Sequence, residues 1–556
     1  MRDLAVIPMT ASTGGRRSRL SANRVFLAVG VLIVVLAASL RIYHIAQRSL
    51  WLDEALAANI SRGTLSQTLI LTRGFHSAPI IHPALLYAVE KVSAGPLAVR
   101  LPSLVASVLA VVLMLCFVTI PAIDYKTAGL AALMLGLSAT QIRYAQEVRE
   151  YSLGVLYAGV LLYVFLAYVW KKDGPGSPIP LYLSLLFAPL VQYGLVLFSS
   201  GILTSLLILA FTGEKPRPKI AQVVAAGAFL GFGGLVAFFL TLRYQWGDDA
   251  WYLKGYFWAP GSSILHFIVL NTHHLITWLL PGLGASVISA IAIALSLVLS
   301  IRKRLVPPLA LLACISCGVV LLCSILHLYP YGGIRQCLFL TPVLCLLASM
   351  SLVQAASKIT GRAHALVFVG IVCVVVISGL FQIRLLQPYA EVEDIQQVLS
   401  SLRSRVLPGD GVYIYPGAAY AVDFYVKIRD SNFIYGNNHR QTPEQYVPEL
   451  LAGIDPAATR VWLVFSHVYG EEDQRILQDL NGGWNIEPVL SAPGAALYLA
   501  SRRPVFIAAV KTGSANASNA TSKTTHGADH THDSFWEWNI RNSRQPAQKS
   551  PAPVRN

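Results

Sequence analysis

The feature that most constrains the fold of this chain is the repetition of apolar stretches about as long as a membrane-crossing helix. An α-helix needs about 20 apolar residues to cross the hydrocarbon core of a bilayer. Eleven stretches reach or approach this length: about 25–42, 97–120, 127–142, 150–170, 180–191, 193–211, 221–242, 283–300, 306–326, 335–356 and 364–385. Only 13% of the residues are charged, against about 25% in soluble proteins. The sequence therefore predicts an α-helical polytopic membrane protein.

The basic residues predict the orientation of these helices. They gather at residues 1–24 and in four short segments between spans: 171–172, 215–219, 302–304 and 358–362. If the N-terminus is cytoplasmic, every one of these segments is cytoplasmic too, as the positive-inside rule requires. The net charge of +15 then reflects topology and contact with membrane lipids, and it does not indicate a nucleic-acid partner. Arg41 and Tyr43 follow the first stretch in place of a small-residue cleavage site, which favours an uncleaved first helix.

Residues 25–387 are therefore predicted to form the transmembrane domain, with an extracytoplasmic loop at 43–96. Segment 264–282 is only moderately apolar, and it contains Asn271, His273 and His274. A polar segment of this kind predicts a re-entrant or interfacial helix in place of a twelfth span.

The C-terminal part has a different composition. In residues 388–510, short β-type runs at 411–416, 460–465 and 496–499 alternate with helical patterns at 418–428 and 471–480. This alternation predicts a small extracytoplasmic α/β domain. Residues 511–556 are rich in Ser, Thr, Asn, Ala and Pro, a composition typical of a disordered tail.

A short acidic run follows the first apolar stretch, where a membrane helix would meet water. The run Ser49-Leu50-Trp51-Leu52-Asp53-Glu54 places two adjacent carboxylates behind a tryptophan, in a chain otherwise poor in acids. Adjacent side chains point to opposite faces of a strand, and they diverge by about 100° on a helix. We therefore expect one acid to face a reaction site, and the other to orient a turn or an arginine. Trp51 is the residue type expected of an interfacial anchor.

The charged and aromatic residues that could form a reaction site lie on one side of the membrane in this topology. They come from four loops, at 43–96, 143–151, 243–258 and 327–335. Arginines bind phosphate, and a carboxylate can deprotonate an acceptor hydroxyl. Their clustering predicts a site for a phosphate-bearing substrate at this face.

Four motifs resemble, in order, a known enzyme superfamily. They are Arg41 with the run 49–54, then His82-Pro83-Ala84-Leu85-Leu86-Tyr87 with Ala98-Val99-Arg100-Leu101-Pro102-Ser103, then residues 144–153, and finally Arg335 ahead of Pro342. This series resembles the dolichyl-phosphate-mannose–protein mannosyltransferase and aminoarabinose transferase superfamily (glycosyltransferase families 39 and 83). The resemblance covers residues 25–390. It implies a GT-C fold and transfer of a sugar from a polyprenyl-phosphate donor to an extracytoplasmic acceptor, which would be a lipid, a protein or a glycan.

The resemblance also implies roles for individual residues. Asp53 matches the catalytic base, and Glu54 becomes its structural neighbour within the substrate-binding set. Arg149 and Arg335 would neutralise the departing polyprenyl phosphate. His82 and Tyr151 complete the substrate-binding residues.

Glu147 matches the acidic position of the second loop, near the donor phosphate, an acceptor or a metal. A divalent metal ion therefore stays open, with Glu147 its candidate ligand, and no other cofactor is implied. The chain departs from the family pattern at Ala84, Glu150 and Gln336, which replace a proline, an apolar residue and a tyrosine.

Two other classes of protein have to be weighed against the enzyme. A transporter or flippase for lipid-linked sugars would place ionisable residues near the bilayer midplane and show inverted repeats, whereas the acids here lie at helix ends. A membrane scaffold would leave the clustering of acids on one face without a reason. The order of the motifs favours the glycosyltransferase, and the absence of a retention signal in the tail favours a bacterial plasma membrane.

Overall fold

The computed structural model describes residues 15–75, 78–170, 176–212, 218–245, 251–302, 307–388, 390, 392–426, 433–439 and 442–503. The tail predicted at 511–556 and residues 246–250 of the loop 243–258 lie outside this described part. The chain divides into two compact units. We call Met1–Gln47 with Ala78–Ala390 the membrane unit, and Arg48–Ser77 with Glu391–Asn556 the α/β unit.

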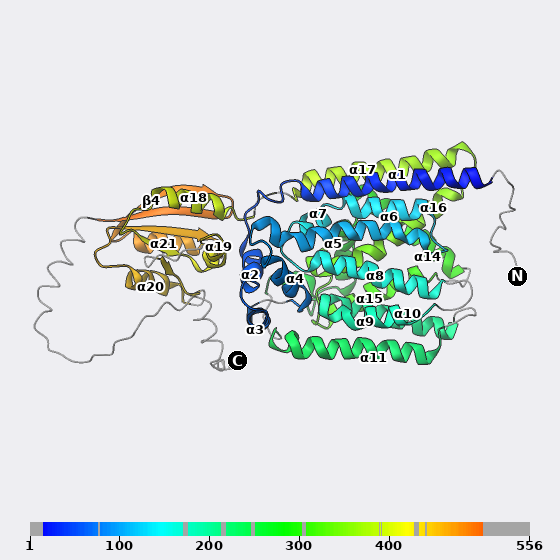
Figure 1. Ribbon diagram of the computed structural model, residues 1–556, viewed down its shortest axis with the longest axis horizontal. Coiled ribbons are helices and arrows are strands. Elements are labelled where there is room, and N and C mark those ends of the chain that lie inside the picture. The colour runs from blue at the N-terminus through cyan, green and yellow to red at the C-terminus, as the bar shows by residue number, and fades with distance from the viewer. Residues whose placement is uncertain are drawn as a thin grey trace, which may run out of the picture. The chain divides into compact units, whose positions relative to one another are not determined.

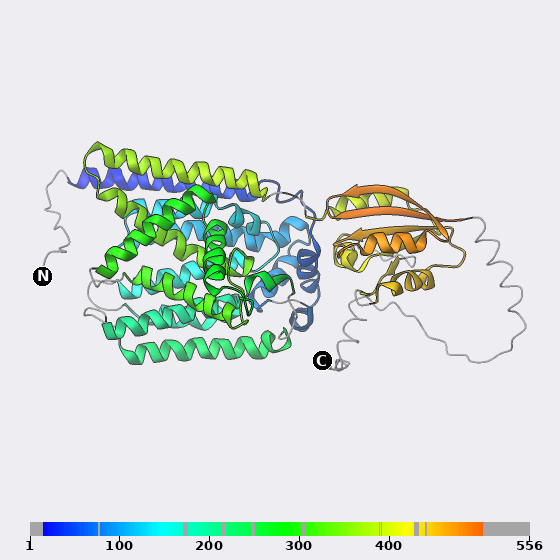
Figure 2. The ribbon, with the colours of Figure 1, turned by 180° about the vertical axis from the view of Figure 1, so that it is seen from behind.

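The long helices of the membrane unit run side by side and roughly parallel (Figures 1 and 2). Within the described residues, nine have the length and apolarity to cross a membrane: α1 (Gly15–Ile42), α5 (Pro96–Cys116), α8 (Tyr151–Val169), α10 (Gly194–Thr212), α11 (Ile220–Ala237), α14 (Gly282–Arg302), α15 (Pro308–Ile325), α16 (Thr341–Ser357) and α17 (Arg362–Leu386). Three shorter apolar helices are α6 (Tyr125–Leu137), α9 (Ile179–Val191) and α13 (Ile264–Leu279). The chain is a multi-pass membrane protein, as predicted.

These helices match the predicted spans closely. The nine long helices together with α6 and α9 cover the eleven predicted stretches, and α13 covers the segment predicted to be re-entrant or interfacial. Burial separates central from peripheral helices. In the span Arg335–Ser357, which includes α16, 89% of the apolar window is buried within the protein, whereas in α17 only 17% is. The side chains of α17 therefore remain available to lipid.

The predicted span 127–142 is wrong in one respect, because it is two helices. α6 ends at Leu137, Ser138 is extended, and α7 runs over Ala139–Ala145. The buried side chain of Arg41 explains the break. Its guanidinium donates to the carbonyls of Leu135 (3.1 Å) and Gly136 (2.9 Å), which have no helical partner once α6 ends.

Arg41 is therefore expected to stabilise the membrane unit strongly. It is fully buried, and its Nε also donates to Ser107 Oγ at 2.8 Å. Arg41→Met should destabilise the protein by roughly 3 kcal/mol, because it leaves buried carbonyls without donors. The measurement is the melting temperature in detergent, with Arg24→Met as the control, since Arg24 is an exposed arginine of the same helix. Equal melting temperatures for the two variants would contradict this role.

The loop predicted at 43–96 contains three short helices. They are α2 (Leu52–Ile60), α3 (Leu65–Phe75) and α4 (Ile81–Glu90). The loop is divided between the two units: α2 and α3 belong to the α/β unit, and α4 belongs to the membrane unit. The acidic run therefore packs with residues more than 300 positions later in the chain.

The α/β unit contains one five-stranded sheet of order β2-β1-β3-β5-β4. The strands are β1 (Gly411–Ile414), β2 (Phe433–Tyr435), β3 (Arg460–Ser466), β4 (Trp484–Ala492) and β5 (Ala495–Arg502). β1 pairs in parallel with β2 and β3, whereas β5 is antiparallel to β3 and to β4. The three predicted strands are present, and β2 and β4 are additional.

Helices cover the sheet of this unit. They are α18 (Ile395–Arg405), α19 (Ala419–Tyr425), α20 (Tyr446–Gly453) and α21 (Glu472–Leu480). One buried layer joins Leu450 of α20 and Ile476 of α21 to Tyr413 and Leu463 of the sheet. α18 contributes Val398, Leu399 and Leu402 as further buried residues. Because β1 and β3 are buried along nearly their whole length, they read as continuous apolar runs in the sequence.

Candidate active site

The loop between α7 and α8 carries the densest group of predicted site residues, and buried polar contacts fix its shape. Gln146 is fully buried, and its Nε2 donates to the carbonyls of Arg41 (2.9 Å) and Tyr43 (2.7 Å). The carbonyl of Arg149 accepts from Ser103 Oγ at 2.9 Å. A loop held from both sides in this way gives its side chains defined directions.

The charged side chains of this loop are buried and close together. Glu147 is 2% exposed, and its Oε1 lies 3.1 Å from Nε of Arg143. Arg149 and Glu150 are also buried, at 8% and 4% exposure. Charged residues are buried in proteins only where they are paired or bind a ligand. The loop is therefore arranged for charge recognition in a place with little water.

Aromatic rings lie beside these charges. Tyr144 and Tyr151 meet edge to face with ring centroids 5.4 Å apart. The guanidinium of Arg335 lies 5.8 Å from the centre of the Tyr151 ring. Burial raises the pKa of Tyr144, and the charge of Glu147 raises it further, so this hydroxyl stays protonated. The structure thus brings together four of the predicted residues, Glu147, Arg149, Tyr151 and Arg335, in one unit.

Arg335 owes its position to the residues that lead into α16. It begins the short 3-10 helix η4 (Arg335–Leu340), which continues directly into α16. The Tyr329 hydroxyl donates to the carbonyl of Gln336 at 2.9 Å, and the Cys337 thiol donates to the carbonyl of Pro330 at 3.3 Å. These contacts tie the loop 327–335 back onto the start of η4. The guanidinium is half-buried, which leaves it able to reach an anion.

His82 lies in the first turn of α4 and is 1% exposed. Burial lowers the pKa of His82 to about 3, and the positive charge of Arg149 contributes to this shift. The imidazole is therefore neutral near pH 7. A neutral ring close to Arg149 can accept or donate a hydrogen bond without opposing the binding of an anion.

The lowered pKa of His82 predicts a pH dependence of stability. Below pH 6.5 the unfolded chain binds a proton at this residue that the folded chain binds only near pH 3, so stability falls as the pH falls through this window. Melting temperatures at pH 7 and pH 5 should therefore differ more for the wild type than for His82→Gln. Exposed His266 supplies the control, because His266→Gln should keep the wild-type difference. The same pH dependence in all three proteins would contradict a buried neutral His82.

The metal ion for which Glu147 is the candidate ligand stays a prediction. Among the described residues, no three His, Cys, Asp or Glu side chains come close enough together to hold a metal ion. The carboxylate of Glu147 instead lies against the guanidinium of Arg143.

Asp53 and Glu54 lie in the first turn of α2, within the α/β unit. Glu54 is fully buried, whereas Asp53 is partly exposed. Acidic side chains in a first turn also favour the helix, because the N-terminal end carries partial positive charge. Of the two carboxylates, only that of Asp53 is open to a reactant.

Trp51, predicted to be an interfacial anchor, packs against a residue that follows β3. Its ring centroid is 6.4 Å from that of His467, in the same unit. Sequence reasoning missed His467 and Glu393, which contact this run, and it gave no role to Gln146. No local signal could have found them, because their partners lie about 100 to more than 400 positions away in the chain.

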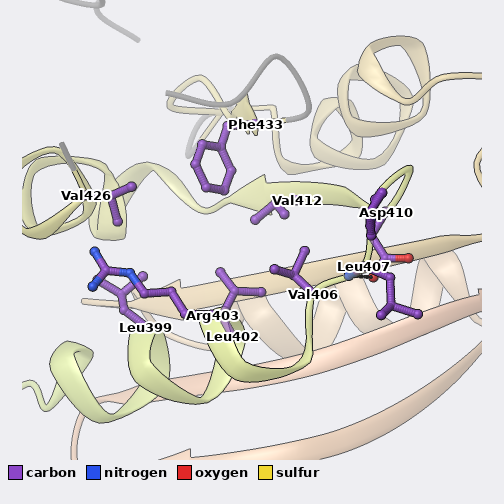
Figure 3. Close-up of a pocket in the computed structure, with 10 residues that line it drawn as sticks. Leu399, Leu402, Arg403, Val406, Leu407, Asp410, Val412, Val426 and Phe433 are labelled. Carbon is purple, nitrogen blue, oxygen red and sulfur yellow. Dashed lines mark hydrogen bonds between the residues drawn. The ribbon is translucent and has the colours of Figure 1, made fainter. Parts of the chain in front are cut away.

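Several cavities lie outside these clusters, and two of them contain polar or charged side chains that could bind a ligand. One, of about 400 Å³ in the membrane unit, is bounded by α13, the start of α14 and the end of α17, and His274, Trp278 and Gln382 line it. The other, of about 330 Å³, lies in the α/β unit between α18 and β1, as Figure 3 shows. In this second cavity Asp410 already accepts from Trp462 Nε1 at 2.8 Å, and Arg403 donates to the carbonyl of Tyr425 at 2.8 Å. Its charged groups are thus engaged by the chain itself.

No protein-family model matches the chain, and no curated protein is similar to it in sequence. Solved structures are similar in fold. ArnT from Cupriavidus metallidurans in the apo state has a TM-score of 0.54 at 12% identity, over 84% of this chain and 97% of that one. The same protein bound to undecaprenyl phosphate has a TM-score of 0.52 at 13% identity, with the same coverage.

An archaeal structure is similar as well. The oligosaccharyltransferase AglB from Archaeoglobus fulgidus, in complex with an inhibitory peptide and a dolichol-phosphate, has a TM-score of 0.51 at 12% identity. The match covers 86% of this chain and 74% of AglB. The motifs, the apolar helices and these comparisons agree, and the chain therefore has the GT-C fold of membrane glycosyltransferases.

Proposed function

We propose that this protein is a membrane glycosyltransferase that moves a sugar from a polyprenyl-phosphate donor to a nucleophile outside the cytoplasm. The observation that carries the proposal is the group formed by buried Glu147, Arg149 and Tyr151 with half-buried Arg335, in a chain of this fold. Two structures similar in fold contain undecaprenyl phosphate or a dolichol-phosphate. Arginines beside a buried loop suit the same kind of lipid phosphate here.

The reaction breaks the bond between the anomeric carbon of the sugar and the phosphate oxygen. The acceptor oxygen attacks the anomeric carbon, and we assign its proton to the carboxylate of Asp53. The bonding electrons leave with the polyprenyl phosphate, which gains negative charge. Arg149 and Arg335 are the cations assigned to this charge, and fixed charges of this kind commonly supply the largest part of the rate enhancement.

The remaining predicted residues bind a substrate or orient another side chain of the site. His82 and Tyr151 would bind the donor, His82 as a neutral imidazole and Tyr151 through its ring. Glu147 orients Arg143 and is placed near the donor phosphate, the acceptor or a divalent metal ion. Glu54, fully buried, supports the turn that carries Asp53.

We further propose that the N-terminus faces the cytoplasm and the α/β unit does not, because this orientation makes the basic loops cytoplasmic. We also propose a bacterial plasma membrane as its location. The sugar, whether a hexose or a pentose, is the group that the test below identifies.

The test is an assay of bond cleavage in vesicles. Purified protein is reconstituted with polyprenyl-phosphate sugars and a membrane extract that contains acceptors. We expect polyprenyl phosphate to accumulate together with glycosylated acceptor. Movement of the donor across the bilayer with its sugar still attached, and without released polyprenyl phosphate, would instead identify a flippase.

A further inference from the structure

The sheet of the α/β unit has a point at which ligands are expected. From β1 the chain passes to β2 on one side, and it then returns to β3 on the other side of β1. In sheets of parallel strands, ligands bind at the carboxyl ends of the strands where this order reverses. Here that point lies between the ends of β1 and β3, at Tyr415 and Ser466.

The groups around this point contact the chain's own acidic run. The Leu50 N–H donates to the hydroxyl of Tyr425, at the end of α19, at 2.8 Å. Asn59 Nδ2, near the end of α2, donates to the carbonyl of Tyr420 at 2.8 Å. Trp51 lies against His467, the residue that follows β3. The run with Asp53 thus packs beside the sheet edge that would otherwise receive a ligand.

Glu393 holds the start of α2. It is 3% exposed, and its Oε2 accepts from the Leu52 N–H at 3.0 Å. Trp51, the residue that precedes α2, makes no side-chain capping bond, so this carboxylate takes the place of a local cap. Leu52 is the residue immediately before Asp53. The backbone at the start of the turn that carries Asp53 is therefore anchored by a residue 341 positions further along the chain.

His467 in turn holds Glu393. Its Nδ1 is hydrogen-bonded to Glu393 Oε1, and Ser466 Oγ lies 3.4 Å from Glu393 Oε2. The backbone of His467 has φ +51°, a left-handed conformation unusual for a residue with a side chain. Gly417 makes this possible, because a Cβ there would lie 2.6 Å from the carbonyl oxygens of Ser466 and His467.

A second, adjacent pair of contacts fixes the preceding turn. Ser49 Oγ donates to Asp394 Oδ1 at 2.9 Å and accepts from the Gln396 N–H at 3.2 Å. At the far end of α2, the Arg62 guanidinium donates to the carbonyls of Asp423 and Phe424 at 3.2 Å each and stacks on the Phe424 ring. The helix is therefore held at both ends and just ahead of its start.

We propose that the α/β unit serves to hold the catalytic base, with Glu393 and His467 as positioning residues for Asp53. This inference rests on the function proposed above. Catalysis depends on reacting groups being held at their productive distance, and a small misplacement can cost about 100-fold in rate. Glu393 removes the freedom of the first turn of α2, and His467 fixes the carboxylate that does so. The domain acts on the reaction through Asp53 and touches no reacting atom through these two residues.

The test compares Glu393→Ala, Glu393→Gln and His467→Gly in the full-length protein. Hydrogen–deuterium exchange of a peptide covering 50–60 reports the order of α2, and initial rates give kcat and KM for a polyprenyl-phosphate sugar. We expect Glu393→Ala to lose protection in α2 and about 10- to 100-fold in kcat, with KM for the donor unchanged. Glu393→Gln keeps an acceptor oxygen. It should therefore recover part of the protection of α2 and part of kcat.

His467→Gly separates positioning from folding. Glycine accepts φ +51° without strain, so the melting temperature should not fall. The protection of α2 and kcat should both decrease, because the side chain that holds Glu393 is gone. Glu487→Ala, at an exposed acid of β4, is the control.

Unchanged exchange in α2, or unchanged kcat in a folded Glu393→Ala protein, would overturn the proposal. So would a loss of activity matched only by a loss of folded protein. Wild-type turnover by Asp53→Asn would contradict the proposed function, whereas the exchange data would still report whether Glu393 holds α2.

Discussion

Asp53→Asn is expected to lower sugar transfer by about 10²- to 10⁴-fold, the range of a general base. The amide keeps the size and polarity of the side chain, but it cannot accept the acceptor's proton at neutral pH. Binding of the donor should be nearly unaffected, because the base acts on the acceptor. The measurement is the initial rate of polyprenyl phosphate release at saturating donor, together with the dissociation constant of the donor.

Two further variants make this result specific. Asp53→Glu should keep part of the activity, since it retains a carboxylate at an altered distance. Asp479→Asn changes an exposed acid in the same unit and should turn over at the wild-type rate. If Asp53→Asn and Asp479→Asn were equally active, Asp53 would not be the base.

Arg335→Gln is expected to lower kcat by about 10²- to 10³-fold, the effect of removing one donor that stabilises developing charge. Arg335 is half-buried beside the Tyr151 ring, so water replaces its charge poorly. The factor by which kcat falls should exceed the factor by which KM rises, because the phosphate gains negative charge only as the bond to the sugar breaks. Steady-state kinetics with varied donor concentration distinguish the two effects.

Arg335→Lys tests the role of the guanidinium geometry. Lysine keeps the charge but not the paired donors of arginine, and it should recover only part of the activity. Arg384, which is exposed at the end of α17, provides the control variant Arg384→Gln. A larger loss in the control than in Arg335→Gln would contradict the assignment.

The helical part of the fold is predictable because bilayer thickness sets the length of each apolar stretch. The eleven predicted spans correspond to helices in the structure. The break at Ser138 is not predictable in this way, because it depends on Arg41 from another helix. The residues next to Ser138 in the sequence give no local sign of this contact.

The sheet was predictable only where its strands are buried. β1 and β3 carry continuous apolar runs. β4 alternates and contains Pro488, a residue typical of edge strands, and β2 has only three residues. Both additional strands are at the edges of the sheet, where the apolar signal is weakest.

The sequence predicts which loops carry the candidate site, but not the contacts that hold its side chains. The acids and arginines of 143–151 and Arg335 stand out in the sequence because charge is rare in this chain. Glu393 does not, since it lies in a polar segment and its role depends on contact with the Leu52 N–H. Contacts over such separations cannot be read from composition or periodicity.

The most direct test of the proposed chemistry follows the oxygen atom that joins the sugar to the phosphate. A polyprenyl-phosphate sugar labelled with ¹⁸O at this position is converted by the wild-type protein, and the products are weighed by mass spectrometry. Attack at the anomeric carbon predicts that the label is found in the released polyprenyl phosphate. Label in the transferred sugar, or a donor that is never cleaved, would contradict the proposed glycosyl transfer.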